Sequence, residues 1–403
     1  MILKKLSLAR FKSGLIHLKK SHLYLKRFIE LRKDEDRAIN LFHAKKRQIP
    51  RVFNLDLHIG VIADLDKELK NSQIEMTQWS ISTHNHLVPG RLPISDPVCH
   101  VNARKWHLMD SEAILKFQSR YKKFLNSFDG FVCTYSPTFS ELYKGLNKPI
   151  LIVAATRYEA PYTDRQGEWD RFNKYLCSGV KNSKIQLYAN NLGDADYIDY
   201  FTGIKPRVVP SLCEKEQISR EQNDRRVIIA RDKRLIDFIE LSTSKTYQSI
   251  TSLGDPYSWE DLKCCEEVLV FPQNISTITL FELATAGVPA AVPSRRWIKE
   301  LIENGYYLLN ELSFHQVLGL DTTNMSSKNP SNYNSPTFLD WWLDRADFYN
   351  KTLMPNVRVV DSVEDLLRNR YKSNYNLPGL TLKRNEKISN LRKNMITEFA
   401  ALL

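Results

Sequence analysis

The stretch from Val268 to Ser294 places the strongest constraint on the fold of this chain. Its apolar run Val268–Phe271 has the length of a buried strand, and a pattern of helical spacing follows from Ser276 and Thr277. The pattern stops at Gly287-Val288-Pro289, and a second short apolar run begins at once. Two strands joined by a helix with tight turns predict a parallel sheet. The helix N-terminus, with its free N–H groups, then lies at a strand end and suits a phosphate group.

This unit resembles the nucleotide-sugar half of GT-B glycosyltransferases, which has a strand, a polar turn, a helix with an internal Glu, and an Ala-Gly-Val-Pro ending. The resemblance implies that Ser276 and Thr277 face the donor diphosphate and that Glu282 binds the ribose hydroxyls. Many retaining members carry a second Glu eight residues earlier, which touches the donor sugar. Here that position is Asn274, which can hydrogen-bond a sugar but has no charge. A plain sheet helix with a solvated Glu282 is the alternative interpretation.

A second apolar run, Val227–Ala230, opens the same predicted domain and ends in Arg231-Asp232-Lys233-Arg234. In GT-B enzymes an Arg and a Lys just after this strand commonly reach the donor diphosphate, and Arg231 and Lys233 match those positions. Their alternative role is a solvated first helical turn. We expect the nucleotide base near residues 253–257 and a final amphipathic helix over 382–400 that crosses back to the first domain.

The length of 403 residues exceeds what one hydrophobic core usually serves, so two domains are expected. The predicted divisions are a basic helical arm (1–50), an acceptor domain (51–213), a nucleotide-sugar domain (226–380) and a crossover helix (381–403), with a polar linker between the two domains. No apolar run is long enough to span a bilayer, and the N-terminus does not resemble a signal peptide. The six cysteines show no regular spacing, which favours reduced thiols and a cytoplasmic location.

Strands and helices also alternate across the first predicted domain, and polar residues follow nearly every strand. An open α/β sheet places its binding crevice at these carboxyl ends. Three such residues can accept a proton and are candidate catalytic bases of an inverting enzyme: Asp56, His84 and Glu159. In a retaining enzyme the same groups would position sugar or acceptor. Four further residues are expected to line the acceptor side of the cleft: His58, Arg157, Asn190 and Asn191.

Most of the net charge of +12 lies in the first 51 residues, which hold 15 Lys or Arg and 4 acidic residues. Apolar residues recur there near helical spacing, as in Leu15, Leu18, Leu25 and Phe28. A basic amphipathic helix of this kind binds an anionic membrane surface or packs on the protein body with its charges solvated. Nucleic acid is the least favoured partner, because no nucleic-acid-binding motif accompanies the charge.

The sequence predicts no metal site. His84 and His86 point apart if extended, and no Cys or carboxylate falls at ligand spacing near them or near His58 and His100. Asp194-Ala195-Asp196 lies at a helix start and is interpreted as an N-cap rather than as a metal motif. The phosphate-binding glycine loops of dehydrogenases and kinases are missing from the sequence.

These observations predict an α/β, GT-B-like fold with two Rossmann-like parallel-sheet domains facing a cleft. The predicted function is metal-independent transfer of a sugar from a nucleotide-diphosphate sugar to a glycan or lipid-linked acceptor, with no cofactor besides the donor substrate. The alternatives are a nucleotide-sugar epimerase or a phosphorylase of the same fold, and a non-catalytic membrane or nucleic-acid adaptor.

Overall fold

A computed structural model describes residues 33, 36–37, 39–40, 48–57, 59–81, 101, 106–213, 223–254, 258–368 and 377–403. Two predicted site residues, His58 and His84, lie outside the described residues, as do nearly all of the basic segment 1–47 and most of the predicted linker. Among the described helices, none combines the length and apolar character needed to cross a bilayer.

The first sheet is parallel and has the strand order β2-β1-β3-β4-β5-β6. Its strands are β1 (Arg51–Asp56), β2 (Glu75–Ser80), β3 (Gly130–Cys133), β4 (Ile150–Ala154), β5 (Ile185–Ala189) and β6 (Arg207–Val208). The helices that connect them are α2 (Ile59–Asn71), η2 (Trp106–Leu108), α3 (Ser111–Leu125), η3 (Pro137–Tyr143), α4 (Gln166–Lys181) and α5 (Leu192–Thr202).

The second sheet is also parallel and has the order β11-β10-β9-β7-β8. Its strands are β7 (Arg226–Ile229), β8 (Gln248–Ser249), β9 (Glu267–Val270), β10 (Ala290–Pro293) and β11 (Val357–Val360). Its helices are α6 (Lys233–Ser242), η4 (Ile250–Leu253), α7 (Trp259–Lys263), α8 (Ile278–Ala286), α9 (Arg295–Glu303), α10 (Phe314–Leu318), α11 (Phe338–Leu343), η5 (Asp347–Tyr349) and α12 (Val363–Arg368).

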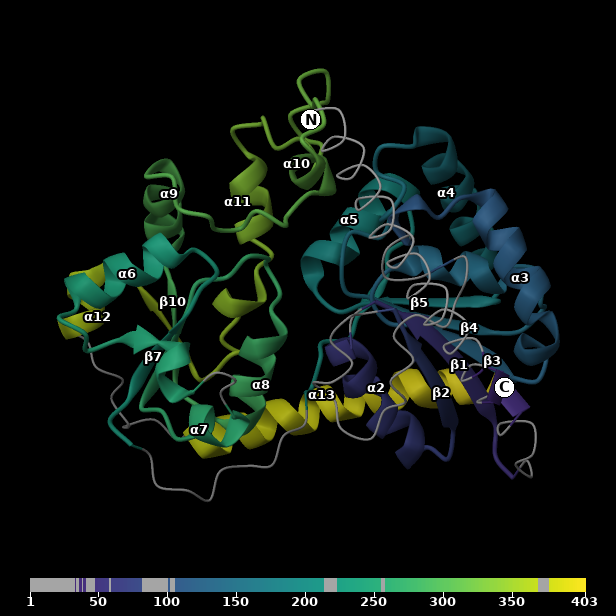
Figure 1. Cartoon of the computed structure of the whole chain (residues 1–403), viewed down its shortest axis with the longest axis horizontal. Coiled ribbons are helices and arrows are strands. Elements are labelled where there is room, and N and C mark those ends of the chain that lie inside the picture. Colours follow the sequence, from purple (N-terminus) through teal and green to yellow (C-terminus); the bar gives the residue numbers. More distant parts are fainter. Residues whose placement is uncertain are drawn as a thin grey trace, which may run out of the picture.

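The two sheets share one topology. In each, the first strand lies between the second and the third, so the direction of winding reverses between β1 and β3 and between β7 and β9. Open α/β sheets bind ligands outside the carboxyl ends of the strands at such a switch point. The two domains lie side by side, with α8 on the side of the second domain that faces the first (Figure 1). The predicted class of two parallel-sheet α/β domains is confirmed.

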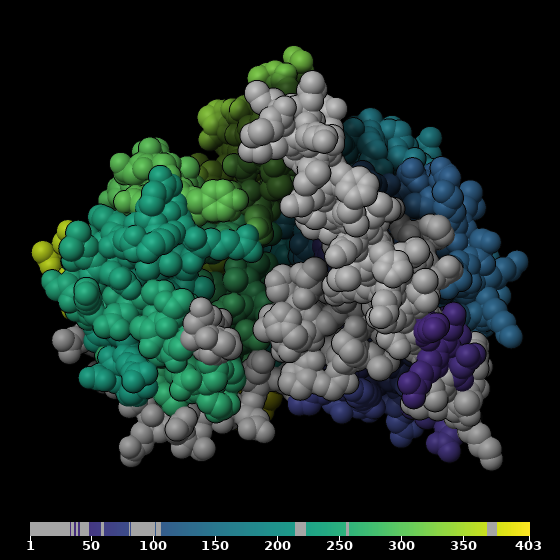
Figure 2. Space-filling view, in the orientation of Figure 1, coloured from purple at the N-terminus to yellow at the C-terminus, as the bar shows by residue number. Residues whose placement is uncertain are grey.

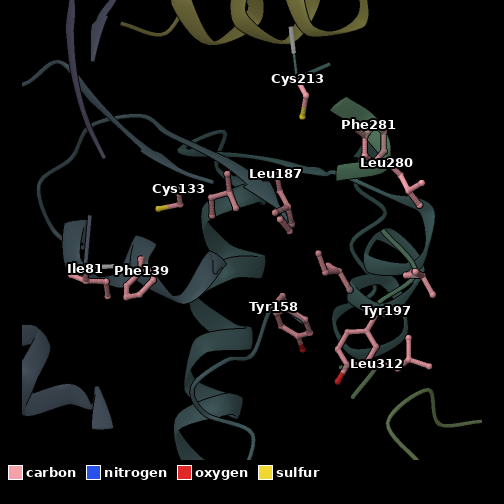
Figure 3. Close-up of a cluster of buried hydrophobic side chains, with 14 of the residues drawn as sticks. Ile81, Cys133, Phe139, Tyr158, Leu187, Tyr197, Cys213, Leu280, Phe281 and Leu312 are labelled. Carbon is pink, nitrogen blue, oxygen red and sulfur yellow. The ribbon is translucent and has the colours of Figure 1, made fainter. Parts of the chain in front are cut away.

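One cluster of buried apolar side chains includes residues of both domains. Tyr158 and Tyr197 of the first domain belong to the same buried cluster as Leu280, Phe281 and Leu312 of the second (Figure 3). Between α5 and the β9–α8 loop the packing is close: a Cβ atom added to Gly193 would lie 2.1 Å from the Ile275 side chain. The domain junction is therefore packed like an interior at this point.

The C-terminal helix α13 (Leu377–Ala400) runs beneath both domains (Figure 1). Near its start, the buried Arg384 donates a hydrogen bond of 2.8 Å to the Thr285 hydroxyl on α8. Further along, Arg392 forms an ion pair of 2.8 Å with Asp64 on α2. Beyond it, Met395 and Phe399 lie in the core of the first domain. One helix thus contacts both halves of the molecule.

Candidate functional site

Arg157 lies at the centre of the junction between the two domains. It follows β4, its side chain is 1% exposed, and its Nη2 atom forms an ion pair of 2.8 Å with Asp194 in the first turn of α5. Its Nη1 atom donates a hydrogen bond of 2.9 Å to the carbonyl oxygen of Leu312 in the second domain. The guanidinium also lies 4.4 Å from the ring centroid of Trp342, a cation–π distance. Arg157 therefore links the domains.

Two asparagines after β5 organise the same junction. Asn191 caps α5: its Oδ1 atom accepts a hydrogen bond of 2.8 Å from the backbone N–H of Asp194. The expected cap at Asp194 is therefore wrong, because Asp194 lies inside the first turn and pairs with Arg157 instead. Asn190 donates a hydrogen bond of 2.6 Å to the Ser211 hydroxyl, which turns its Oδ1 atom toward Ser276 of the second domain.

The structure brings predicted donor residues and predicted acceptor residues into contact. The Oγ atom of Ser276 lies 3.4 Å from Asn190 Oδ1. The Oδ1 atom of Asn274 lies 3.4 Å from both terminal nitrogens of Arg157 and accepts a hydrogen bond of 2.9 Å from the N–H of Ile275. These residues do not face each other across open space; they meet where the β9–α8 loop packs on the first domain.

Glu159 is a fully buried carboxyl at this junction. Its Oε1 atom accepts a hydrogen bond of 3.0 Å from Tyr197, whose hydroxyl also lies 2.7 Å from the Ser331 hydroxyl of the second domain. Its Oε2 atom has no hydrogen-bond partner. Burial raises the pKa of Glu159 to about 7, although Tyr197 and Arg157 favour the charged form. A carboxyl with this pKa can accept or donate a proton near neutral pH.

Asp347 is a second buried carboxyl at the junction, and the sequence analysis did not single it out. It begins η5, its side chain is 4% exposed, and its backbone N–H donates a hydrogen bond of 3.0 Å to the carbonyl oxygen of Ile275. Burial raises the pKa of Asp347 to about 7. Asp347 lies in residues 304–356, where apolar residues show little helical or strand periodicity. The aromatic-rich run 338–349 is the sequence feature that could have drawn attention to it.

Asp56 ends β1 at the switch point of the first sheet and is fully buried. Its Oδ2 atom accepts hydrogen bonds from the N–H groups of Thr134 and Tyr135 and from the Thr134 hydroxyl, and Oδ1 accepts one from Leu57. Burial raises the pKa of Asp56 to about 6, against the effect of these hydrogen bonds. Through these hydrogen bonds the carboxyl holds the loop after β3 in place. The assignment of Asp56 as a catalytic base stays a prediction.

Arg231 and Lys233 lie at the other switch point, where β7 ends beside β9. Arg231 forms an ion pair with Glu311, whose backbone N–H donates a hydrogen bond of 3.2 Å to the carbonyl oxygen of Gln273 after β9. Lys233 is highly exposed and lies 3.5 Å from Asp237 one turn along α6. Figure 2 shows this domain, in teal and green, forming one side of the molecular surface. Tyr135 of the first domain is close enough to Glu311 for an electrostatic interaction.

Glu282 and Thr277 occupy different parts of α8. Thr277 is the N-cap residue, and its side chain makes no capping hydrogen bond. Glu282 is half-buried, and its charge acts on Cys213, whose pKa is raised mainly by burial. Thr285, three residues further on, donates a hydrogen bond to the carbonyl oxygen of Leu212. This side of α8 therefore faces the segment that leaves the first domain.

The described residues contain no group of three or more His, Cys, Asp or Glu side chains that could hold a metal ion. One buried histidine lies at the junction: the Nδ1 atom of His315 has no partner, its ring lies 6.0 Å from that of Trp169, and burial lowers its pKa. The five described cysteines form no disulfide. The absence of a metal site stays a prediction.

No family model and no curated protein sequence matches this chain. Among solved structures, it is similar to the glycotransferase of kitacinnamycin (9% identity, TM-score 0.39, covering 88% of this chain and 98% of that one). It is also similar to spinosyn rhamnosyltransferase SpnG (10% identity, TM-score 0.39, covering 86% and 99%). A UDP-GlcNAc 2-epimerase from Neisseria meningitidis is similar at 12% identity and TM-score 0.37, covering 80% and 100%. These likenesses are remote, and the fold described above rests on the strand order and register.

Proposed function

We propose that this chain is a GT-B glycosyltransferase that moves a sugar from a nucleotide-diphosphate sugar to a glycan or lipid-linked acceptor. The observation that carries the proposal is the switch point between β7 and β9. There the β9–α8 loop leads to an uncapped helix N-terminus, and Arg231 follows the adjacent strand. A helix N-terminus next to an arginine at a switch point suits a diphosphate.

On this proposal, the donor would bind along the β9–α8 unit. Ser276 and Thr277 would donate to the diphosphate, and Arg231, with Lys233 beside it, would neutralise the charge of the leaving nucleotide. Glu282 would bind the ribose, and Asn274 would contact the sugar. The ion pair of Arg231 with Glu311 is exposed, so exchanging Glu311 for a phosphate group would cost little.

The first domain would supply the acceptor side. Glu159 has an unpartnered carboxyl oxygen and a pKa of about 7, so it is the described candidate best suited to take the proton of an acceptor hydroxyl. Asp56 and His84 remain the other proposed bases. Arg157 and Asn190 would hold the two domains together through their contacts with Leu312 and Ser276, and Asn191 would cap α5 beside them. His58 would lie at the acceptor side.

The experiment that tests the proposal is a thermal-shift screen of the full chain against UDP-, GDP-, CMP- and dTDP-sugars. A bound donor raises the melting temperature by mass action. We expect at least one nucleotide sugar to do so, and Glu282→Ala to remove the shift. A flat response to every donor would contradict the proposal. Consumption of a donor without any acceptor, giving an isomeric nucleotide sugar, would instead identify an epimerase.

Metal independence and the role of the basic segment are part of the same proposal. Turnover should persist in excess EDTA, because the helix N-terminus and Arg231 would carry out charge neutralisation. The segment 1–47 is proposed to attach a cytoplasmic enzyme to anionic membranes, with each Lys or Arg adding about 1 kcal/mol near the surface. Deleting it should abolish binding to phosphatidylglycerol vesicles at low salt and spare turnover of a soluble acceptor. Unchanged vesicle binding after the deletion would contradict this role.

A further inference from the structure

A cavity of about 300 Å³ lies on the second domain between residues 327–330 and the start of α11. Pro330, Phe338 and Trp341 give it an apolar surface, and of these Pro330 and Phe338 are buried. Three polar residues that reach solvent lie at its margin: Ser327, Lys328 and Asn329. The described lining residues all belong to 327–341, a segment outside the proposed donor site. An apolar cavity with a few polar groups is typical of a small-molecule site.

Two consecutive tryptophans of α11 have different environments. Trp342 is fully buried, its Nε1 atom donates a hydrogen bond of 3.0 Å to the carbonyl oxygen of Pro330, and its ring lies at a cation–π distance from Arg157. Trp341 is half-buried and lines the cavity, and its Nε1 atom donates no hydrogen bond to another described residue. Trp342 therefore stabilises the junction, whereas the ring and N–H of Trp341 are available to a ligand.

Arg345 fixes the orientation of the Trp341 ring. Its guanidinium lies 4.0 Å from the ring centroid, and its Nη1 atom donates a hydrogen bond of 2.8 Å to the carbonyl oxygen of Trp341. Its Nε atom forms an ion pair of 2.7 Å with Asp196 on α5, the helix of the first domain that lies nearest to α11 in Figure 1. The cavity thus lies beside the first domain, and its ring is already ordered, which lowers the entropic cost of binding.

The polar groups at the margin are suited to hydroxyl groups. The hydroxyl of Ser327 and the ammonium of Lys328 make no hydrogen bond with another described residue. Asn329 uses its Oδ1 atom to accept a hydrogen bond of 2.9 Å from the N–H of Ser331, so its amide nitrogen remains a donor.

A pyranose ring matches this arrangement, because it has an apolar C–H face for an aromatic ring and hydroxyls around its edge for the donors. A diphosphate would gain only one cation here, that of Lys328, and it has no apolar face to place on Trp341. A purely apolar chain would cover the polar groups at the margin without offering them hydrogen bonds, which is unfavourable.

We propose that this cavity binds one pyranose residue of a neutral glycan, with the C–H face on Trp341 and the hydroxyls toward Ser327, Lys328 and Asn329. This binding goes beyond the proposed donor site and needs no nucleotide sugar. The role of the glycan as the acceptor rests on the proposed function. On that proposal, the acceptor is a chain of several sugars that is held at a second point beside the first domain.

The test measures binding of neutral oligosaccharides to the full chain by saturation-transfer NMR and calorimetry. The probes are α-1,4- and α-1,6-linked glucohexaose, β-1,4-linked mannohexaose and N-acetylchitohexaose. Neutral probes are required because the net charge of +12 would attract any polyanion. We expect at least one of them to bind with a Kd below about 1 mM. No binding of any probe would overturn the proposal.

Trp341→Ala should weaken the binding of that glycan by at least about tenfold, as expected for the loss of a central aromatic contact. Trp259→Ala is the matched control, because Trp259 is also half-buried in the second domain but lies on α7, outside the cavity. It should bind with unchanged affinity. An equal loss in the two variants would overturn the proposal, as would unchanged affinity in a folded Trp341→Ala.

Lys328→Ala keeps the proposal testable if Trp341→Ala does not fold. Lys328 is exposed and forms no ion pair with a described residue, so its removal should leave the melting temperature unchanged. Glycan affinity should fall about threefold, the order of one solvent-exposed hydrogen bond. Unchanged affinity in this variant would remove Lys328 from the site and, without a folded Trp341→Ala, overturn the proposal.

The outcomes also separate this proposal from the proposed function. Binding of a nucleotide sugar without binding of any glycan would overturn the glycan site and leave the proposed function intact. Glycan binding that Trp341→Ala removes, in a protein that binds no nucleotide sugar, would support the glycan site and contradict the proposed function.

Discussion

Two arginines, Arg157 and Arg231, follow strands on opposite sides of the domain junction, and each is paired with a carboxylate. The pair Arg157–Asp194 is 1% exposed on both sides, whereas Arg231 and Glu311 are 62% and 40% exposed. Removing one partner of a buried pair leaves an uncompensated charge in the interior, whereas an exposed pair contributes little. Arg157 therefore stabilises the packed junction between the domains. Arg231 can exchange Glu311 for a ligand at a small cost in free energy.

Hydrogen-bond partners separate the carboxyls. Those of the junction, Glu159 and Asp347, are buried, each has one oxygen without a partner, and their pKa values are raised to about 7. Asp232, the N-cap residue of α6, is also buried, but hydrogen bonding from the exposed Arg234 is the main cause that lowers its pKa to about 2. Carboxyls with shifted pKa values cluster at functional sites. Here Glu159 and Asp347, which can titrate near neutral pH, lie inside the junction, whereas the exposed ion pair of Arg231 lies at its edge.

The largest expected effect is on the buried pair. Arg157→Ala should lower the free energy of unfolding by about 3–5 kcal/mol, because Asp194 would be left buried without its partner. Urea unfolding measures this. The double variant Arg157→Ala with Asp194→Asn should recover part of the loss, since no charge then remains unpaired. A decrease in the free energy of unfolding of less than about 1 kcal/mol in the single variant would show that Arg157 does not stabilise the junction.

The second prediction concerns the pH dependence of stability. The pKa of Glu159 is raised from 4.5 to about 7 by folding, so the folded state holds its proton more tightly than the unfolded state. The carboxyl should thus reduce the free energy of unfolding progressively between pH 4.5 and 7, by about 3 kcal/mol in total, and by a constant amount above pH 7. Unfolding measured against pH should show a smaller decline in Glu159→Gln. An identical profile would mean that the carboxyl is charged in the folded protein.

The third prediction concerns donor binding on α8. Glu282→Ala should weaken nucleotide-sugar binding by ~2–4 kcal/mol, roughly 30- to 1000-fold, because two charge-assisted contacts to the ribose are lost. Calorimetry on the purified variant measures this. Glu300→Ala, on the exposed side of α9, serves as a control and should bind normally. Unchanged affinity in the Glu282 variant would remove Glu282 from the donor site.

The smallest expected effect on stability is at the exposed pair. Arg231→Ala should change the free energy of unfolding by no more than about 1 kcal/mol, since its ion pair with Glu311 lies in solvent. Donor affinity should nevertheless fall by about tenfold, the order expected for one charge-assisted hydrogen bond. Lys233→Ala tests the neighbouring cation in the same two assays. A large loss of stability in the Arg231 variant would contradict the contrast with Arg157.

Much of the fold followed from local sequence pattern. The run from Val268 to Ser294 predicted β9, α8 and β10, and α8 ends at Gly287 in the left-handed conformation that favours glycine. The alternation of apolar runs with polar strand ends likewise predicted the first sheet and pointed to Asp56, Arg157 and Asn190. These features are short-range, because strand burial and helix termination depend on neighbouring residues.

The sequence by itself determined that there are two parallel α/β sheets and which residues follow their strands. The tertiary structure alone decided which of those residues meet. Arg157 and Asn274 are 117 positions apart and were assigned to opposite sides of a cleft, yet they are in contact. Asp347 is buried where its backbone N–H bonds to the carbonyl oxygen of Ile275, and no local pattern reports the burial of a single polar side chain. Contacts between distant segments and the loss of solvent around a charge are properties of the packed chain, and they set the pKa values and exchangeable charges from which function follows.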